Sequence, residues 1–148
     1  MIGLSFRETM SGAYHLCATP DVDRPMHFTI EARLRSLRSF FTNTVLDIRG
    51  EIVAEGFADH KVLDGTLCID LFRGRVLVYQ FAFEGNDGLA YSFNGRKTLS
   101  KGGLVQAMTV LPGGLFDSAG HKVATALLRF DLRSDLLKFL GSYKLVRS

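Results

Sequence analysis

Glu8 is the residue of the N-terminal segment whose type departs most from its surroundings and could do chemistry. Phe6 and Met10 flank it two positions away on either side, and residues two apart lie on the same face of a strand. A carboxylate on an apolar face needs a basic partner, a hydrogen-bond donor or a raised pKa. Glu8 is therefore a candidate to hold the polar head of a ligand or to act as an acid or base, with a structural ion pair at a strand end as the alternative.

Two basic residues are the expected partners of Glu8. Lys97 is in phase with Phe93 on the apolar face of a later alternating segment. Arg129 lies in another alternating segment, and its direction is left open. We predict that Glu8 points inward and is paired with Lys97 or Arg129. The predicted ligand-binding residues are Glu8, Met10, Tyr91, Phe93, Lys97 and Arg129.

The other polar residues do not form known catalytic or ligand motifs. The four histidines show neither His-x-His nor His-Glu-x-x-His spacing, so we expect no metal site. The run 95–98 matches only the end of a phosphate-binding loop, since position 90 is alanine and the flanks alternate like strands. No Gly-x-Ser-x-Gly elbow occurs. We therefore expect no metal, nucleotide or other cofactor, and no covalent hydrolase.

The elements that would position these side chains are mostly strands. Apolar and polar residues alternate in short segments separated by turn residues, of which 86–88 is the clearest hairpin turn. Residues 112–114, Pro-Gly-Gly, are expected to close a strand. Helical spacing behind a capping serine predicts two short helices, at 36–43 and 135–140. The predicted strands are 4–16, 26–34, 46–52, 63–71, 76–84, 89–94, 104–111, 124–132 and 142–146.

Length and composition agree with one β domain. A chain of 148 residues is near the usual size of a single domain, so we assign 1–148 to one domain. It has 12 Phe and 15 Gly against 3 Pro and no Trp, which favours strands joined by tight turns. The prediction is an all-β, mainly antiparallel fold, a closed or nearly closed barrel or a curled sandwich of about eight or nine strands.

Charge and hydropathy exclude some partners. The net charge of +3 comes from basic residues spread among acids, whereas a nucleic-acid site would cluster them. No apolar run approaches the ~18 residues of a membrane span. Only two cysteines, Cys17 and Cys68, occur, and they lie far apart. We expect no nucleic-acid binding, no membrane span and a cytoplasmic location.

Two predicted strands, 76–84 and 104–111, are apolar on both faces. One face of each would lie in the core, and the other must be covered by the short helices or by a second subunit. The pattern therefore predicts a homodimer.

Three short motifs stand in order along the chain. They are Phe6-x-Glu8-x-Met10-x-Gly12, Ile48-x-Gly50-x-Ile52 and Phe93-x-Gly95-x-Lys97. In order and spacing they resemble a β-rich accessory domain that accompanies cholesterol-oxidase-like flavin oxidoreductases and some α/β-hydrolase-like proteins in bacteria. The resemblance implies a non-catalytic module near lipid or sterol chemistry, and it carries over no catalytic residue. A likeness to lipocalins would be architectural only, because their Gly-x-Trp motif is absent.

Three functions are left open by the sequence. The leading one is a non-catalytic module that binds a small apolar or lipid-like ligand inside a barrel. The second is a homo-oligomeric assembly protein, and the third is a cofactor-free isomerase or cyclase that uses Glu8 as acid or base. The sequence favours the non-catalytic classes because it offers no evident catalytic partner for Glu8.

Overall fold

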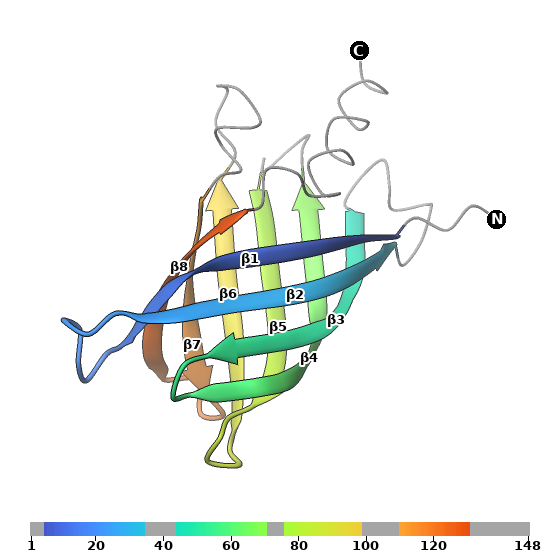
Figure 1. The fold of residues 1–148 in the computed structure, drawn as a ribbon. Coiled ribbons are helices and arrows are strands. Elements are labelled where there is room, and N and C mark those ends of the chain that lie inside the picture. The colour runs from blue at the N-terminus through green and yellow to red at the C-terminus, as the bar shows by residue number, and fades with distance from the viewer. Residues whose placement is uncertain (1–4, 35–43, 71–75, 99–109, 131–148) are drawn as a thin grey trace.

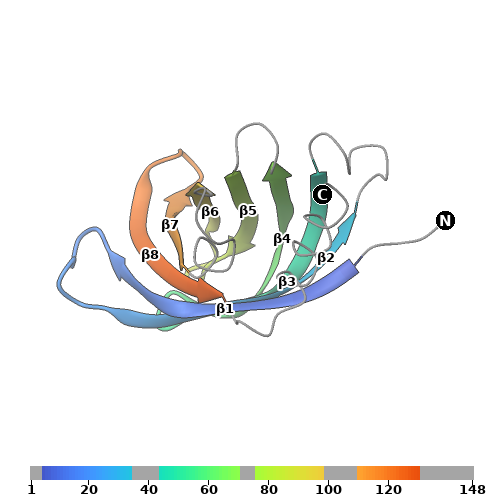
Figure 2. The same ribbon diagram turned by 90° about the horizontal axis from the view of Figure 1, so that it is seen from above.

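The described residues form a closed antiparallel β-barrel. The computed structural model describes residues 5–34, 44–70, 76–98 and 110–130 (Figure 1). Each strand pairs with the next along the chain, and β1 pairs with β8 to close the ring (Figure 2). The strands are β1 (Ser5–Leu16), β2 (Arg24–Leu34), β3 (Thr44–Ala54), β4 (Ala58–Asp70), β5 (Val76–Glu84), β6 (Ala90–Thr98), β7 (Val110–Asp117) and β8 (Lys122–Phe130).

The predicted all-β antiparallel class is confirmed, and closure decides for the barrel over the curled sandwich. The strands form a barrel because apolar and polar residues alternate along them. Apolar residues at every second position give each strand one face that can lie in a common interior. β3 and β4 are longer than the predicted 46–52 and 63–71. The two predicted helices, the strand 142–146 and most of 104–111 lie outside the described residues.

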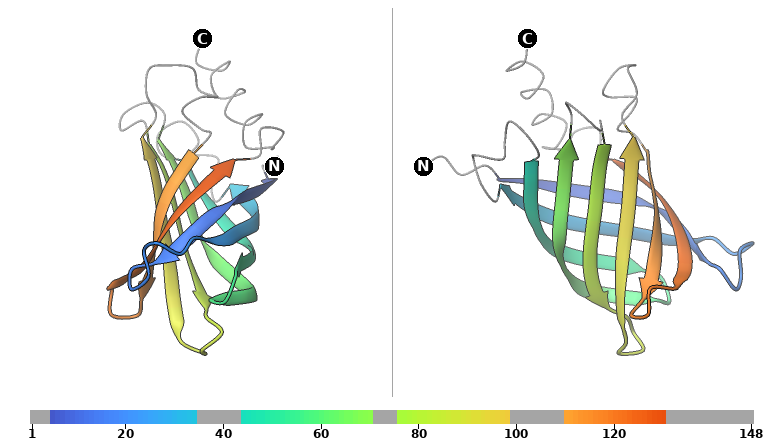
Figure 3. Two further views of the ribbon diagram at one scale, coloured as in Figure 1. Left: turned by 60° about the vertical axis from the view of Figure 1, so that its left-hand side comes forward. Right: turned by 180° about the vertical axis from the view of Figure 1, so that it is seen from behind.

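The barrel is strongly bent, so that β1 and β2 cross β5 and β6 at a steep angle (Figures 1 and 3). Glycines lie where neighbouring backbones come closest. A Cβ at Gly50 of β3 would lie 1.8 Å from the carbonyl oxygen of Thr29, and a Cβ at Gly65 of β4 would lie 1.9 Å from that of Gln80. Since any side chain would collide with backbone there, only glycine fits these two positions without a shift.

The middle of the interior is filled by aromatic rings around Phe28 of β2. Its ring centroid lies 5.9 Å from Tyr79, 5.1 Å from Phe81 and 5.6 Å from Phe93. Phe81 and Phe93 stack on each other at 4.9 Å. A Cβ at Gly95 or at Gly113 would lie within 2.8 Å of the Phe93 ring, so the ring occupies the space that these glycines leave. Phe93 is therefore a core residue.

One end of the barrel, which we call the hairpin end, carries the turns β1–β2, β3–β4, β5–β6 and β7–β8. Phe57 lies there against Tyr14, Phe83 and Tyr91, with centroid distances of 6.1, 6.2 and 4.7 Å. The Tyr14 hydroxyl donates a hydrogen bond to the carbonyl of Glu55. This aromatic cluster fills the hairpin end. The opposite end, where β1 begins and β8 ends, is called the far end below.

The expectation that 112–114 close a strand is wrong, because β7 runs through them to Asp117. Pairing of β6 with β7 ends at Gly113, so Pro112 lies where β7 is paired only with β8. A strand bordered on one side only tolerates a residue without an N–H.

The outer face of β5 is less buried than a two-sided apolar strand requires. Val76 and Val78 are half-buried and Ala82 is exposed. Described large apolar side chains that are well exposed are scattered singly, as on most proteins. The homodimer stays a prediction.

Candidate functional site

Glu8 points into the barrel, as predicted. It lies on β1 between Phe6 and Met10, and only 1% of its surface is exposed. Its cross-strand neighbour on β2 is Ile30, which is also buried. Among the described residues, Glu8 and Thr44 are the buried side chains classed as polar or charged. An ionisable group thus lies in an otherwise apolar wall.

The structure adds a residue that the sequence reasoning missed, Tyr79 of β5. It is fully buried, with ring centroids 5.9 Å from Phe28 and 6.2 Å from Phe130. Both of these phenylalanines are cross-strand partners of Met10, one on each side of β1. The Tyr79 ring therefore crosses the interior to the part of β1 that carries Met10 and Glu8.

The electrostatic state of Tyr79 follows from this position. Burial raises the pKa of its phenol well above the ordinary 10.0, and the charge of Glu8 raises it further. The phenol therefore keeps its proton and acts as a hydrogen-bond donor at neutral pH. Its oxygen is buried and has no hydrogen-bond partner among the described residues. A buried donor without an acceptor is costly to the protein.

Lys97 faces inward near the far end but does not pair with Glu8. Its strand neighbours Phe93 and Gly95 are buried, whereas Lys97 itself is partly exposed, opposite Leu77 of β5. Within the described ranges, no ion pair joins it to Glu8. The long stem of Lys97 leaves its ammonium near water, which avoids the cost of burying a charge.

The prediction that Arg129 pairs with Glu8 is wrong. On β8 the buried residues are Ala124, Ala126, Leu128 and Phe130, so Arg129 points to the outer face and is exposed. Strict two-sided alternation leaves no inward position for it.

The remaining predicted site residues divide between the two ends of the barrel. Met10 is fully buried beside Glu8, and Phe93 is part of the central ring cluster. Tyr91 lies at the hairpin end, where its hydroxyl donates a 2.6 Å hydrogen bond to Asp87. That bond raises the pKa of Tyr91 and lowers the pKa of Asp87. Tyr91 therefore belongs to the turn at the hairpin end. The tyrosine that lies near Glu8 and Met10 is Tyr79.

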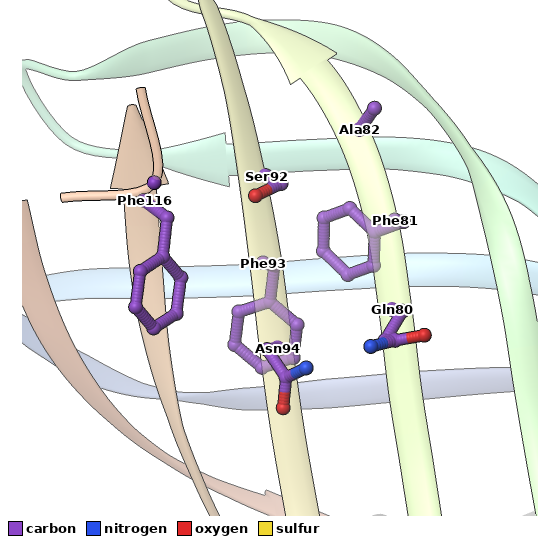
Figure 4. A pocket seen from close by; sticks show the side chains of 8 residues that line it. Gln80, Phe81, Ala82, Ser92, Phe93, Asn94 and Phe116 are labelled. Carbon is purple, nitrogen blue, oxygen red and sulfur yellow. The ribbon is translucent and has the colours of Figure 1, made fainter. Parts of the chain in front are cut away.

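A groove on the outer surface is the alternative binding place. It has a volume of about 470 Å³ and lies over β5, β6 and β7 (Figure 4). Gln80, Ser92, Asn94 and Phe116 line it with neutral side chains. None of the charged residues of the predicted site lies in this groove.

In the described part of the chain, no three His, Cys, Asp or Glu side chains lie close enough to hold a metal ion. None of the described residues belongs to a helix that is long and apolar enough to span a membrane.

We expect Tyr79→Phe to raise the free energy of unfolding of the unliganded protein by about 1–3 kcal/mol. The substitution keeps the ring contacts with Phe28 and Phe130 and removes a buried oxygen that no described residue hydrogen-bonds. Chemical denaturation at neutral pH measures the change. Tyr91→Phe is the matched control, and it should lower the free energy of unfolding because it breaks the bond to Asp87. A loss for Tyr79→Phe as well would show that its hydroxyl is already satisfied.

The stability of the wild-type protein should also depend on Tyr79 at alkaline pH. The folded phenol has a pKa above the unfolded value of 10.0, so the folded state holds its proton more tightly. Stability from this source is present below the unfolded pKa and is lost as the pH rises above it. Above the unfolded pKa, the wild-type protein should therefore lose stability more steeply than Tyr79→Phe. The free energy of unfolding of both proteins can be measured by chemical denaturation at a series of increasing pH values. An equally steep loss in both would contradict a raised pKa of Tyr79 in the folded state.

Comparison with known proteins finds no relative of this chain. No family model, no curated protein and no solved structure matches the chain. The site must therefore be interpreted from its own residues.

Proposed function

We propose that the protein is a non-catalytic module that binds a small, largely apolar ligand inside the barrel, with the ligand's polar head between Glu8 and Tyr79. The observation that carries the proposal is the buried Tyr79 hydroxyl, which has no hydrogen-bond partner among the described residues. Leaving such a donor without an acceptor costs about 1–3 kcal/mol, which phenylalanine would avoid. A ligand group that accepts the hydrogen bond accounts for the tyrosine.

The apolar part of the ligand would lie toward the far end. Phe6, Leu77 and Phe130 are inward-facing, buried, and within one residue of the ends of β1, β5 and β8. The hairpin end is filled by the cluster around Phe57. An eight-stranded barrel has room for one small ligand at most. Entry from the far end would place a polar head at Glu8 and Tyr79 and an apolar body along these three side chains.

A cofactor-free isomerase is the second candidate, and one observation favours it. Tyr79 supplies the second polar group that the sequence did not reveal, so a carboxylate base and a phenol donor lie on facing walls. Such a pair can move a proton within a bound carbonyl compound. Incorporation of deuterium into a bound ligand in heavy water, lost in Glu8→Gln, would favour this candidate over simple binding.

Other expectations stay predictions. The resemblance to the accessory domain of flavin oxidoreductases agrees with an apolar ligand, and it is part of the proposal only in that sense. The cytoplasmic location and the homodimer also stay predictions, and light scattering at micromolar concentration tests the dimer.

Binding to the neutral, solvent-sensitive dye Nile red tests the proposal. We expect saturable binding with one site per chain, because the dye is apolar and carries a carbonyl that can accept from Tyr79. Tyr79→Phe should weaken binding about tenfold, the equivalent of one hydrogen bond. The control Tyr91→Phe changes the same atom at the hairpin end and should leave the affinity unchanged.

Two outcomes would contradict the proposal. One is the absence of saturable dye binding. The other is an equal loss of affinity in Tyr79→Phe and Tyr91→Phe, which would place the dye elsewhere.

A further inference from the structure

We propose that the outer groove over β5, β6 and β7 is a second binding site, and that it takes a neutral saccharide. This inference goes beyond the interior site and does not depend on it. The groove has a volume of about 470 Å³ and contains two amide side chains, a serine and the ring of Phe116. Amides and an aromatic ring are the groups that can hold a sugar ring.

The strand register brings the lining residues into two rows. Residues that pair across neighbouring strands face the same side of the sheet, and neighbouring strands lie about 4.8 Å apart. Both rows lie on the outer face, because Phe81 and Phe93, which lie between them along β5 and β6, are buried. The amides and the ring are therefore close neighbours on one surface. One row contains Gln80, Asn94 and Gly114, and the other contains Ala82, Ser92 and Phe116.

The ring of Phe116 extends along β7 toward Gly114. A Cβ at Gly114 would lie 3.2 Å from Cε1 of the ring and 3.3 Å from Cζ, so the ring reaches the space that this glycine leaves open. Figure 4 shows the ring directed toward the level of Asn94 and Gln80. Phe116 is half-buried, so part of its ring is open to a ligand.

The polar side chains of the groove are available to a ligand. Within the described ranges, Gln80, Ser92 and Asn94 make no side-chain hydrogen bond to another residue. Each amide has both donors and an acceptor. A sugar hydroxyl also donates and accepts, so neighbouring hydroxyls of one sugar can bond to both amides at once.

The charges around the groove favour neither an anion nor a cation. No charged side chain lines it. Asp64 lies beside it as the cross-strand partner of Ala82, and it forms an ion pair with Arg49. Lys122 lies on the other side as the partner of Phe116. Because a charged ligand would lose hydration without gaining an ionic partner in the groove, the matching ligand is neutral.

Other neutral ligands would use only part of the groove. A purely apolar ligand would cover the ring but would remove water from the amides without replacing its hydrogen bonds. An acyclic polyol has hydroxyls but no rigid face for the ring. An extended peptide would need an open strand edge, and here β6 is paired on both sides. A pyranose has C–H groups on its faces and hydroxyls around its edge, so it can contact the ring and both amides together.

Titration of the isotope-labelled chain with cellotetraose, followed by NMR, tests the inference. Cellotetraose is a neutral, extended tetramer of glucose. We expect saturable shifts of the side-chain amide signals of Gln80 and Asn94, with a dissociation constant on the order of 1 mM, as an open site with few hydrogen bonds gives. Sorbitol, which lacks a ring, and the anionic tetragalacturonate should both bind more weakly.

Variants assign the binding to the groove. Phe116→Leu keeps an apolar side chain and removes the ring, so it should weaken cellotetraose binding about fivefold. Asn94→Ala removes one amide and should weaken it by a similar factor. Leu127→Ala is the control, since Leu127 is 51% exposed on β8 and does not line the groove. Retained dispersion of the backbone amide signals shows that each variant is folded.

The outcomes separate this inference from the proposed function. An absence of shifts at Gln80 and Asn94, or an unchanged affinity in Phe116→Leu, would overturn the saccharide site. Binding of sorbitol or tetragalacturonate as tight as that of cellotetraose would overturn it too. None of these results bears on the interior, where Nile red binding and its dependence on Tyr79 are measured separately.

Discussion

Replacing Phe28 by alanine is expected to lower the free energy of unfolding by about 3–5 kcal/mol. The Phe28 ring is fully buried and contacts the rings of Tyr79, Phe81 and Phe93, which come from two other strands. The substitution removes apolar burial and leaves a cavity that these rings cannot fill without leaving their own contacts. Chemical denaturation, followed by circular dichroism, measures the loss.

Two comparisons make the Phe28 result specific. Phe28→Leu keeps much of the volume and should cost clearly less than the alanine variant. Val62→Ala changes a side chain that is 75% exposed on β4 and should change stability by no more than about 0.5 kcal/mol. A Phe28→Ala variant as stable as Val62→Ala would contradict a core centred on this ring.

Gly65→Ala is expected to destabilise the barrel by about 1–3 kcal/mol or more, although it adds only a methyl group. A Cβ at this position would lie 1.9 Å from the carbonyl oxygen of Gln80 and 2.5 Å from the Cα of Phe81. Both atoms belong to the backbone of β5, so the methyl group fits only if paired strands move apart. Thermal and chemical denaturation measure the effect.

Gly114→Ala is the matched control. The Cβ at Gly114 would approach only the end of the Lys122 side chain, at 3.1 Å, and the edge of the Phe116 ring, at 3.2 Å. These side chains can move by a few tenths of an ångström, so the cost should be small. If both variants lose the same stability, the close approach of β4 and β5 at Gly65 is not what makes glycine necessary there.

The sequence was sufficient for the fold class and for the direction of Glu8. Both follow from alternation, since every second residue of a strand faces the same side. The position of Glu8 between Phe6 and Met10 required it to share their environment, and its 1% exposure agrees. The hairpin turn 86–88 was also predictable, because a glycine at the end of a polar run is typical of a tight turn. In the structure Gly88 has a positive φ of 80°, which suits glycine.

The presence of Tyr79 in the same part of the interior as Glu8 was not predictable, because alternation gives the face of a strand but not the strand that lies opposite. Tyr79 is on β5, four strands from β1 in the closed order. Only closure and bending of the barrel bring its ring to the neighbours of Met10. In the sequence, Tyr79 is one more aromatic residue in an apolar strand, so its residue type did not indicate a polar group in the interior near Glu8.

One error came from choosing a partner by its charge, and another came from grouping residues by strand face alone. Arg129 attracted the prediction because it is basic, although its own alternation with Leu128 and Phe130 places it outside. Tyr91 was grouped with Phe93 because the two share a face, but Tyr91 and Lys97 lie near opposite ends of β6. The alternation along each strand correctly gave the face on which a residue lies. It gave no information on the position of that residue along the barrel axis.

A crystal structure of the protein with Nile red tests the central claim most directly. We expect one dye molecule inside the barrel, with its carbonyl oxygen within hydrogen-bonding distance of the Tyr79 hydroxyl. The apolar part of the dye should lie along Phe6, Leu77 and Phe130. Dye bound instead in the outer groove beside Gln80 and Phe116, or an interior without dye at saturating concentration, would contradict the claim.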